Sequence, residues 1–282
     1  MSKRNPKLPV VTTLGAAIRQ TVQNAAGYGL LALPTFLFSL LSYYVQVSQL
    51  NYSISSGDFS RNRFDLITIS LQIASLAFYV MLFANVVRRT LLGRAGPRNA
   101  LGLGWGWREF RIVGRYVLVL MLMLLLLAPI FVLVVALISD KEAAAWLAFV
   151  PLVTLALVVF VSCRMLPYIT APSLDARLGL GDAFDSGKGN VLRIFACFLL
   201  LMLPYLVAWL VFAVTVGSPI DMAMLLMTRS FLAVIVFNFI GLTWTVFSMV
   251  LVALIYEHLV LVPAAEQNQS PSGTSSSDVS GY

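Results

Sequence analysis

The sequence predicts an all-α integral membrane protein in which six transmembrane helices form three hairpins. Three observations favour this fold class. Apolar residues make up 60% of the 282 residues and charged residues only 11%, against about 25% charged residues in soluble domains. Six apolar segments are each long enough to cross the roughly 30 Å of hydrocarbon in a bilayer. Lysine and arginine are concentrated in alternate connections between these segments.

The composition also excludes several classes of protein. With a mean hydropathy of +0.90, the chain has too few polar side chains to cover the surface of a water-soluble globule. A soluble enzyme, a nucleic-acid-binding domain and a disordered protein are therefore excluded. The net charge is +7, but the placement of the cations fits membrane topology, so no nucleic-acid partner is expected.

Each predicted span is an apolar run of about 20 residues. The third is the clearest, because its 23 residues carry no charge. The first run is longer than the apolar core of a signal peptide, so we expect an uncleaved helix. The spans are Gly27–Gln49, Leu66–Val87, Tyr116–Ile138, Ala143–Val161, Val191–Val216 and Phe231–Tyr256. Residues 1–263 thus form the transmembrane domain, and the Ser/Gly-rich residues 264–282 are expected to be a disordered cytoplasmic tail.

The distribution of cations predicts the orientation. Four Lys or Arg precede the first span, seven lie in the second connection and four in the fourth. Those fifteen lie on one side of the membrane, and only four lie on the other. By the positive-inside rule, both termini are cytoplasmic.

A short amphipathic segment before each odd-numbered span indicates an internal repeat. An alignment of residues 14–24 with residues 180–190 matches Leu, Gly, Ala and Asn at identical positions. Before the third span, residues 106–111 occupy the same place with a poorer match. The odd-numbered spans carry Pro34, Pro129 and Pro204. Such self-similarity is typical of duplicated units. We therefore expect three pseudo-repeated hairpins, each preceded by a short interfacial amphipathic helix.

Aromatic and basic residues ahead of the third span predict an anchor at the membrane surface. The lipid or interface anchors are Trp105, Trp107, Arg108, Arg111 and Arg115. Tryptophan favours the interface, and arginine is attracted to anionic lipids at the cytoplasmic face. General anchoring and recognition of a particular headgroup both remain open.

The residues that usually carry chemistry form no recognisable site. The two cysteines lie in apolar segments, and the single histidine, His258, lacks the partners of a metal site. Asp175, Asp182 and Asp185 fit a solvated surface neutralised by Arg177 and Lys188 better than a cation site. The glycine-rich residues 102–107 and 187–190 match neither a dinucleotide-binding nor a phosphate-binding loop and fit turns. We therefore expect no catalytic residue, cofactor or metal.

Polar residues inside the spans are few. Asn238, near Gly241 in the sixth span, is the predicted intramembrane polar contact. It fits either hydrogen bonding between helices or a contact with a pore or substrate. The three prolines likewise fit either a packed bundle or a central cavity.

One short motif resembles a known group. Leu180-Gly181-Asp182-Ala183-Phe184 followed by Lys188-Gly189-Asn190 is similar to a cytoplasmic signature of uncharacterised bacterial six-span inner-membrane proteins. That group includes the glycerophosphodiester phosphodiesterase membrane-domain-like proteins. The resemblance implies a six-helix protein of the bacterial plasma membrane, and no catalytic residue is carried over from it.

These observations predict a non-enzymatic inner-membrane protein with an accessory, scaffold or envelope-maintenance role. It would act through contacts with helices and lipids, with a membrane protein complex as a further partner. The alternative is a transporter or channel for a lipid-like or small apolar solute.

Overall fold

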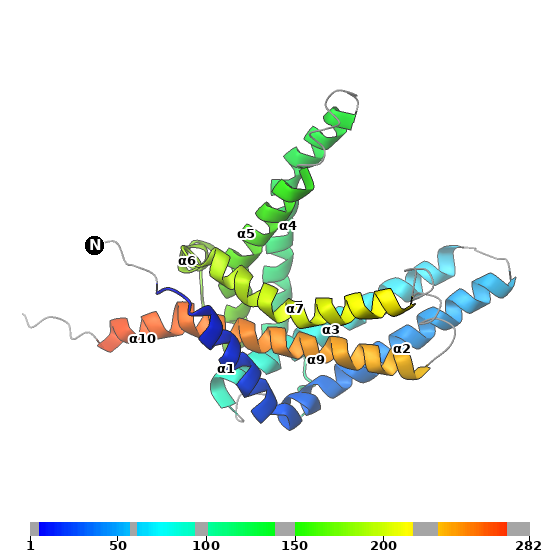
Figure 1. Cartoon of the computed structure of the whole chain (residues 1–282), viewed down its shortest axis with the longest axis horizontal. Coiled ribbons are helices and arrows are strands. Elements are labelled where there is room, and N and C mark those ends of the chain that lie inside the picture. Colours follow the sequence, from blue (N-terminus) through cyan, green and yellow to red (C-terminus); the bar gives the residue numbers. More distant parts are fainter. Residues whose placement is uncertain (1–5, 57–60, 94–100, 139–149, 217–230, 270–282) are drawn as a thin grey trace, which may run out of the picture.

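The computed structural model describes residues 6–56, 61–93, 101–138, 150–216 and 231–269, and within these ranges all regular structure is helical (Figure 1). A 3₁₀ turn, η3, and a π-helical turn, η4, supplement the α-helices. The elements are α1 (Val10–Gln23), α2 (Ala25–Ser56), α3 (Arg61–Leu92), α4 (Trp107–Ile138), α5 (Val150–Thr170), η3 (Ala171–Leu174), α6 (Leu180–Ser186), α7 (Val191–Val216), α9 (Phe231–Tyr256), η4 (Glu257–Leu261) and α10 (Val262–Gln269).

Five of these helices, α2, α3, α4, α5 and α9, are long and apolar enough to cross a membrane. A sixth candidate is the pair α6 and α7, which meet at an angle of 75°. Gly189 forms this bend with a φ of +79°, a left-handed conformation that glycine adopts without steric cost. The apolar helices indicate a multi-pass membrane protein, and the predicted sixth span is present only if the bent pair counts as one.

The helices form two arms that meet at one end (Figure 1). The main arm consists of α2, α3, α7 and α9, while the α4–α5 arm diverges from it. α9 is the central helix. In the apolar stretch of its candidate span 44% is buried, against 11% in the corresponding stretches of α3 and α4. The largest buried cluster joins α9 residues such as Val250 and Ile255 to residues of α1, α2, α3 and α7.

α1 packs on the main arm through a face of small residues. Thr13, Ala17 and Thr21 follow one another at a spacing of four and are buried against α7 and α9. The Thr13 and Thr21 hydroxyls donate to backbone carbonyls four residues earlier, both at 2.8 Å, so neither is left unpaired in the contact. Ile18 and Val22 point outward. A helix before the first span is therefore confirmed, with its apolar side exposed.

The segment before the third span is not a separate helix. Residues 107–111 form the first turn of α4, which continues unbroken to Ile138. Nothing between Arg111 and Tyr116 ends the helix, because the one weak helix former there, Gly114, is tolerated inside a long helix. The expectation of a short helix before every odd-numbered span is thus wrong for the third, and the threefold repeat stays a prediction.

Two predicted boundaries also differ. The fourth span was expected to end at Val161, whereas α5 continues to Thr170, since arginine at 164 is a good helix former. Its predicted start at Ala143 lies outside the described residues. The expected disorder from residue 264 is wrong as far as Gln269, since α10 covers these residues and Ala264 and Ala265 favour a helix. Residues 270–282 lie outside the described part.

Candidate functional site

The end where the two arms meet collects most of the arginines that the structure describes, and we call it the basic end. α2, α4 and α7 begin there, and α3, α5 and α9 end there. Its arginines are Arg88, Arg89, Arg108, Arg111, Arg115, Arg164 and Arg193. Their contacts decide whether they face lipid or hold the helices together.

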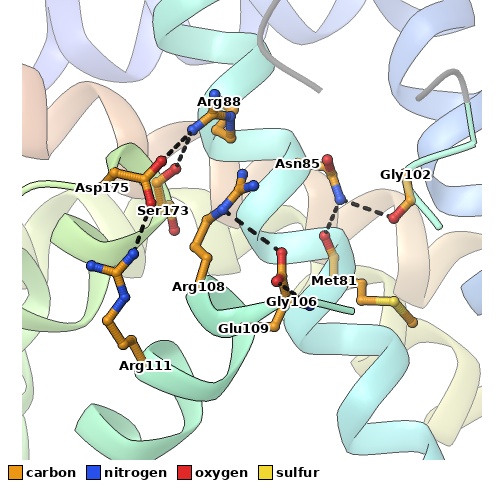
Figure 2. A network of polar contacts seen from close by, with 10 residues as sticks. All are labelled: Met81, Asn85, Arg88, Gly102, Gly106, Arg108, Glu109, Arg111, Ser173 and Asp175. Carbon is orange, nitrogen blue, oxygen red and sulfur yellow. Dashed lines mark hydrogen bonds and ion pairs between the residues drawn. The ribbon is translucent and has the colours of Figure 1, made fainter. Parts of the chain in front are cut away.

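Asp175 joins the two arms at the basic end. Its carboxylate accepts hydrogen bonds from Arg88 of α3 at 3.1 Å and from Arg111 of α4 at 2.9 Å (Figure 2). Arg88 also donates to the Ser173 carbonyl at 3.2 Å. Asp175 has a φ of 57°, a left-handed conformation that aspartate adopts more readily than most residues. This residue was expected to be neutralised by Arg177 and Lys188, but its ion pairs come from other helices.

Glu109 caps the N-terminus of α4. Its side chain is 3% exposed, and one carboxylate oxygen accepts the Gly106 backbone N–H at 2.8 Å, three residues back. This geometry caps a free N–H group and places a negative charge at the positive end of the helix dipole. The other oxygen lies 3.9 Å from Nε of Arg108 (Figure 2). Arg108 therefore faces a protein carboxylate.

Two further arginines lie over aromatic rings. The Arg115 guanidinium is 4.4 Å from the centre of the Tyr168 ring and donates to the Tyr168 carbonyl at 2.8 Å. Arg164 lies 4.9 Å from the Phe160 ring and 4.1 Å from the Phe184 ring of α6. Such cation–π contacts reduce the cost of taking the charge out of water. They fix α5 against α4 and α6.

The predicted anchor therefore divides into two groups. Trp105 and Trp107 are exposed, Trp107 by 76%, and both rings pack against Phe110, with centroid distances of 5.4 and 6.4 Å. We call these three residues the aromatic patch. Arg108, Arg111 and Arg115, in contrast, all contact protein groups. Binding of lipid by the aromatic patch stays a prediction.

The loop that carries Trp105 is tied to α3. The Asn85 amide donates to the carbonyls of Met81, at 2.7 Å, and Gly102, at 3.0 Å (Figure 2). Gly102 has a φ of +64°, and a side chain there would press against Leu31 and Asn85. The interpretation of this glycine-rich stretch as a turn into the next helix is confirmed, and so is that of residues 187–190.

Residues 6–8 are held at the basic end by Asn190. The Asn190 side chain accepts the Leu8 N–H at 2.8 Å and donates to the Pro6 carbonyl at 2.9 Å. Arg193 donates to the Leu8 carbonyl at 3.0 Å, and a ring nitrogen of His258 lies 3.3 Å from the Lys7 carbonyl. Leu8 itself is fully buried. The predicted structural position of His258 thus includes a contact with the N-terminal segment.

A second polar region, the polar cleft, lies in the main arm away from the basic end. It has a volume of about 250 Å³ between α2, α3 and α9. Its lining residues are Thr35, Phe38, Ser39, Ser42, Tyr43, Gln46, Ser75, Phe78, Tyr79 and Asn238. Within it, the Ser39 hydroxyl donates to the Asn238 side-chain oxygen at 2.7 Å, and the Gln46 amide donates to the Ser42 hydroxyl at 3.2 Å.

The sequence analysis selected Asn238 but missed its neighbours on α2. Thr35, Ser39, Ser42 and Gln46 follow at spacings of four, three and four residues, which place them on one face of a helix. This stripe was visible in the sequence. Its approach to Asn238, about 200 residues later, was not.

The three prolines do not surround one cavity. Pro34 and Pro204 lie in the main arm, and Pro204 borders an apolar groove of about 360 Å³ with Leu14, Ile18 and Phe239. Pro129 lies far along α4, in the other arm. This arrangement does not favour the interpretation that the three prolines open one central cavity.

Neither a metal site nor a known relative adds to this picture. In the described ranges, no group of three His, Cys, Asp or Glu side chains could hold a metal ion. Comparison of the chain with protein-family models, curated proteins and solved structures gave no match.

Proposed function

We propose that the chain is a non-enzymatic accessory or scaffold protein of the bacterial inner membrane, with both termini in the cytoplasm. It acts through contacts with lipids and with the helices of a membrane protein complex. The bacterial location rests on the resemblance of residues 180–190 to six-span inner-membrane proteins, and the orientation rests on the cations at the basic end.

The observation that carries this proposal is the uncovered apolar surface of the α4–α5 arm. Met121, Leu124 and Leu125 of α4 are 60%, 53% and 70% exposed. An arm that diverges from the main bundle offers this surface to lipid or to a helix of another protein. Helices in a bilayer associate through packing and hydrogen bonds, so a partner would be selected by its shape.

The basic end supports a structural role for the charged groups. Asp175 and Glu109 are occupied by arginine and backbone donors of the protein. In these positions the carboxylates fix the junction between the arms, which sets the direction in which the α4–α5 arm points.

Photo-crosslinking in native membranes tests the proposal. A photoreactive residue replaces Leu125 on α4, and the matched control replaces Leu41 on α2, which is 55% exposed in the main arm. We expect one discrete protein adduct from position 125 and only lipid adducts from position 41. Lipid adducts alone at both positions would contradict the scaffold role.

A transporter or channel for a lipid-like or small apolar solute is the second candidate. Two apolar grooves of about 390 and 360 Å³ favour it, because they lie on α9 and share Phe239 and Thr243. Movement of a fluorescent phospholipid in proteoliposomes that slows in the Phe239→Ala variant would support this candidate. Movement equal to that in empty liposomes would exclude it for this lipid.

A further inference from the structure

The polar cleft lies at membrane depth. Ser42 is 17 residues after the start of α2 at Ala25, which corresponds to about 26 Å along the helix. Ser42 and Gln46 belong to the candidate span Ala25–Gln46, and Asn238 begins the candidate span of α9. The cleft therefore lies in the half of the main arm that is remote from the basic end.

The lining of the cleft is polar but uncharged. Its polar residues carry hydroxyl or amide groups, and none of the ten lining side chains is ionisable at neutral pH. A hydroxyl or amide facing hydrocarbon without a partner costs several kcal/mol. The Thr35, Ser39 and Gln46 side chains donate to partners within the protein, and hydroxyl and amide oxygens can accept a further hydrogen bond from a molecule in the open space.

The size of the cleft exceeds what a single water needs. A volume of about 250 Å³ compares with roughly 10–15 Å³ for one water and with roughly 300–1,000 Å³ for pockets that bind drug-sized ligands. The cleft thus fits a small solute or the terminal part of a lipid headgroup.

Aromatic rings add a second recognition element. Phe38 and Phe78 stack with centroids 4.6 Å apart, and both line the cleft together with Tyr43 and Tyr79. Rings of this kind pack against C–H groups, while serine and amide side chains bind hydroxyl groups. The combination matches a molecule that carries both.

We infer that the polar cleft binds a small uncharged polyol, either free or as the hydroxylated headgroup of a glycolipid. Ser39 and Asn238 hydrogen-bond to each other at one side of the cleft, and Ser42 and Gln46 do so on the next turns of α2. These four side chains present hydroxyl and amide groups to the ligand. The site is independent of the scaffold role.

Cysteine accessibility tests this inference in the full chain in nanodiscs. Gln46→Cys introduces a thiol at an exposed position of the cleft, and Leu41→Cys, on the exposed apolar face of α2, is the matched control. The native cysteines, Cys163 and Cys197, are buried, so their background is low. Thiolates react where water reaches them. A membrane-impermeant thiosulfonate should label the Gln46→Cys variant and leave the control unlabelled.

Protection identifies the ligand and its source. In phosphatidylcholine nanodiscs, saturating glycerol or glucose should slow labelling of the Gln46→Cys variant at least twofold, whereas sodium chloride of equal osmolarity should not. Protection only in nanodiscs that contain diglucosyldiacylglycerol would assign the site to a lipid headgroup. Absence of labelling, or labelling that none of these molecules slows, would overturn the inference.

Folding of the variants is checked separately. Their thermal unfolding midpoints should match that of the native chain. If the Gln46→Cys variant fails to fold, Tyr79→Cys places the thiol on the α3 side of the cleft, where Tyr79 is 38% exposed, and the same outcomes apply.

Discussion

The basic end and the polar cleft both place polar side chains among apolar helices, but they use them differently. At the basic end, Asp175, Glu109 and Asn190 bind arginine or backbone groups of the protein itself. In the cleft, side chains of α2, α3 and α9 surround an open volume. Side chains bind one another in both regions, but those of the cleft also border an open volume, which leaves room for another molecule. Substitutions should separate these two roles.

The largest effect is expected at Asn190. Asn190→Ala leaves the Leu8 N–H and the Pro6 carbonyl without their partner, and each buried group left unpaired costs about 1–3 kcal/mol. We expect the thermal unfolding midpoint in detergent to fall clearly and residues 6–9 to become sensitive to protease. The matched control is Asn24→Ala, since the Asn24 amide donates to the Gln20 carbonyl one turn earlier, at the end of α1. Equal effects of the two variants would contradict this account of Asn190.

Loss of the Asp175 carboxylate should have a smaller effect. Asp175 is 52% exposed, and ion pairs at that exposure contribute roughly 0.2–1 kcal/mol each. Asp175→Asn should therefore lower the unfolding midpoint modestly at low salt. The difference from the native chain should shrink at about 1 M salt, where the Debye length is about 3 Å. Asp182→Asn on α6 is the control, and a midpoint change there as large as at 175 would argue against the ion pairs.

The Glu109 cap should contribute about as much as a typical helix N-cap. Glu109→Ala removes the acceptor for the Gly106 N–H and should cost about 1 kcal/mol. Glu109→Gln keeps an oxygen within reach of that N–H and should cost less. Thermal unfolding of the three proteins side by side checks this order. A Gln variant as unstable as the Ala variant would show that charge, rather than capping, is what matters.

The smallest effect on stability is expected in the polar cleft. Ser39→Ala removes the hydrogen bond to Asn238, and such bonds between membrane helices contribute about 0.6 kcal/mol on average. We expect an unfolding midpoint close to that of Thr245→Val, a control on α9 whose hydroxyl bonds only to the Gly241 carbonyl. A large loss of stability in the Ser39→Ala variant alone would mean that the cleft is a packing interface.

Features that depend on local composition could be predicted from the sequence. The helical class, the apolar helices and the helix before the first span follow from composition and from a spacing of three to four residues. The polar stripe of Thr35, Ser39, Ser42 and Gln46 belongs to the same category, although it was missed. Such patterns need no knowledge of distant residues.

Features that depend on distant contacts could not be predicted. The contact of Arg164 with the ring of Phe184, twenty residues later, is one of them. Arg108, Arg111 and Arg115 contact Glu109, Asp175 and Tyr168, and their role as lipid anchors stays a prediction. Only the folded arrangement brings Asp175 and Tyr168 to these arginines, so local sequence gives no sign of these two pairings.

The most direct test makes the same substitution in both regions. Asn190→Leu and Asn238→Leu replace an amide with an apolar group of similar size, once at the basic end and once in the polar cleft. The thermal unfolding midpoint of each variant is measured in the same nanodiscs. This account predicts a large decrease for Asn190→Leu and little change for Asn238→Leu. Equal decreases, or a larger decrease for Asn238→Leu, would contradict the distinction between the two regions.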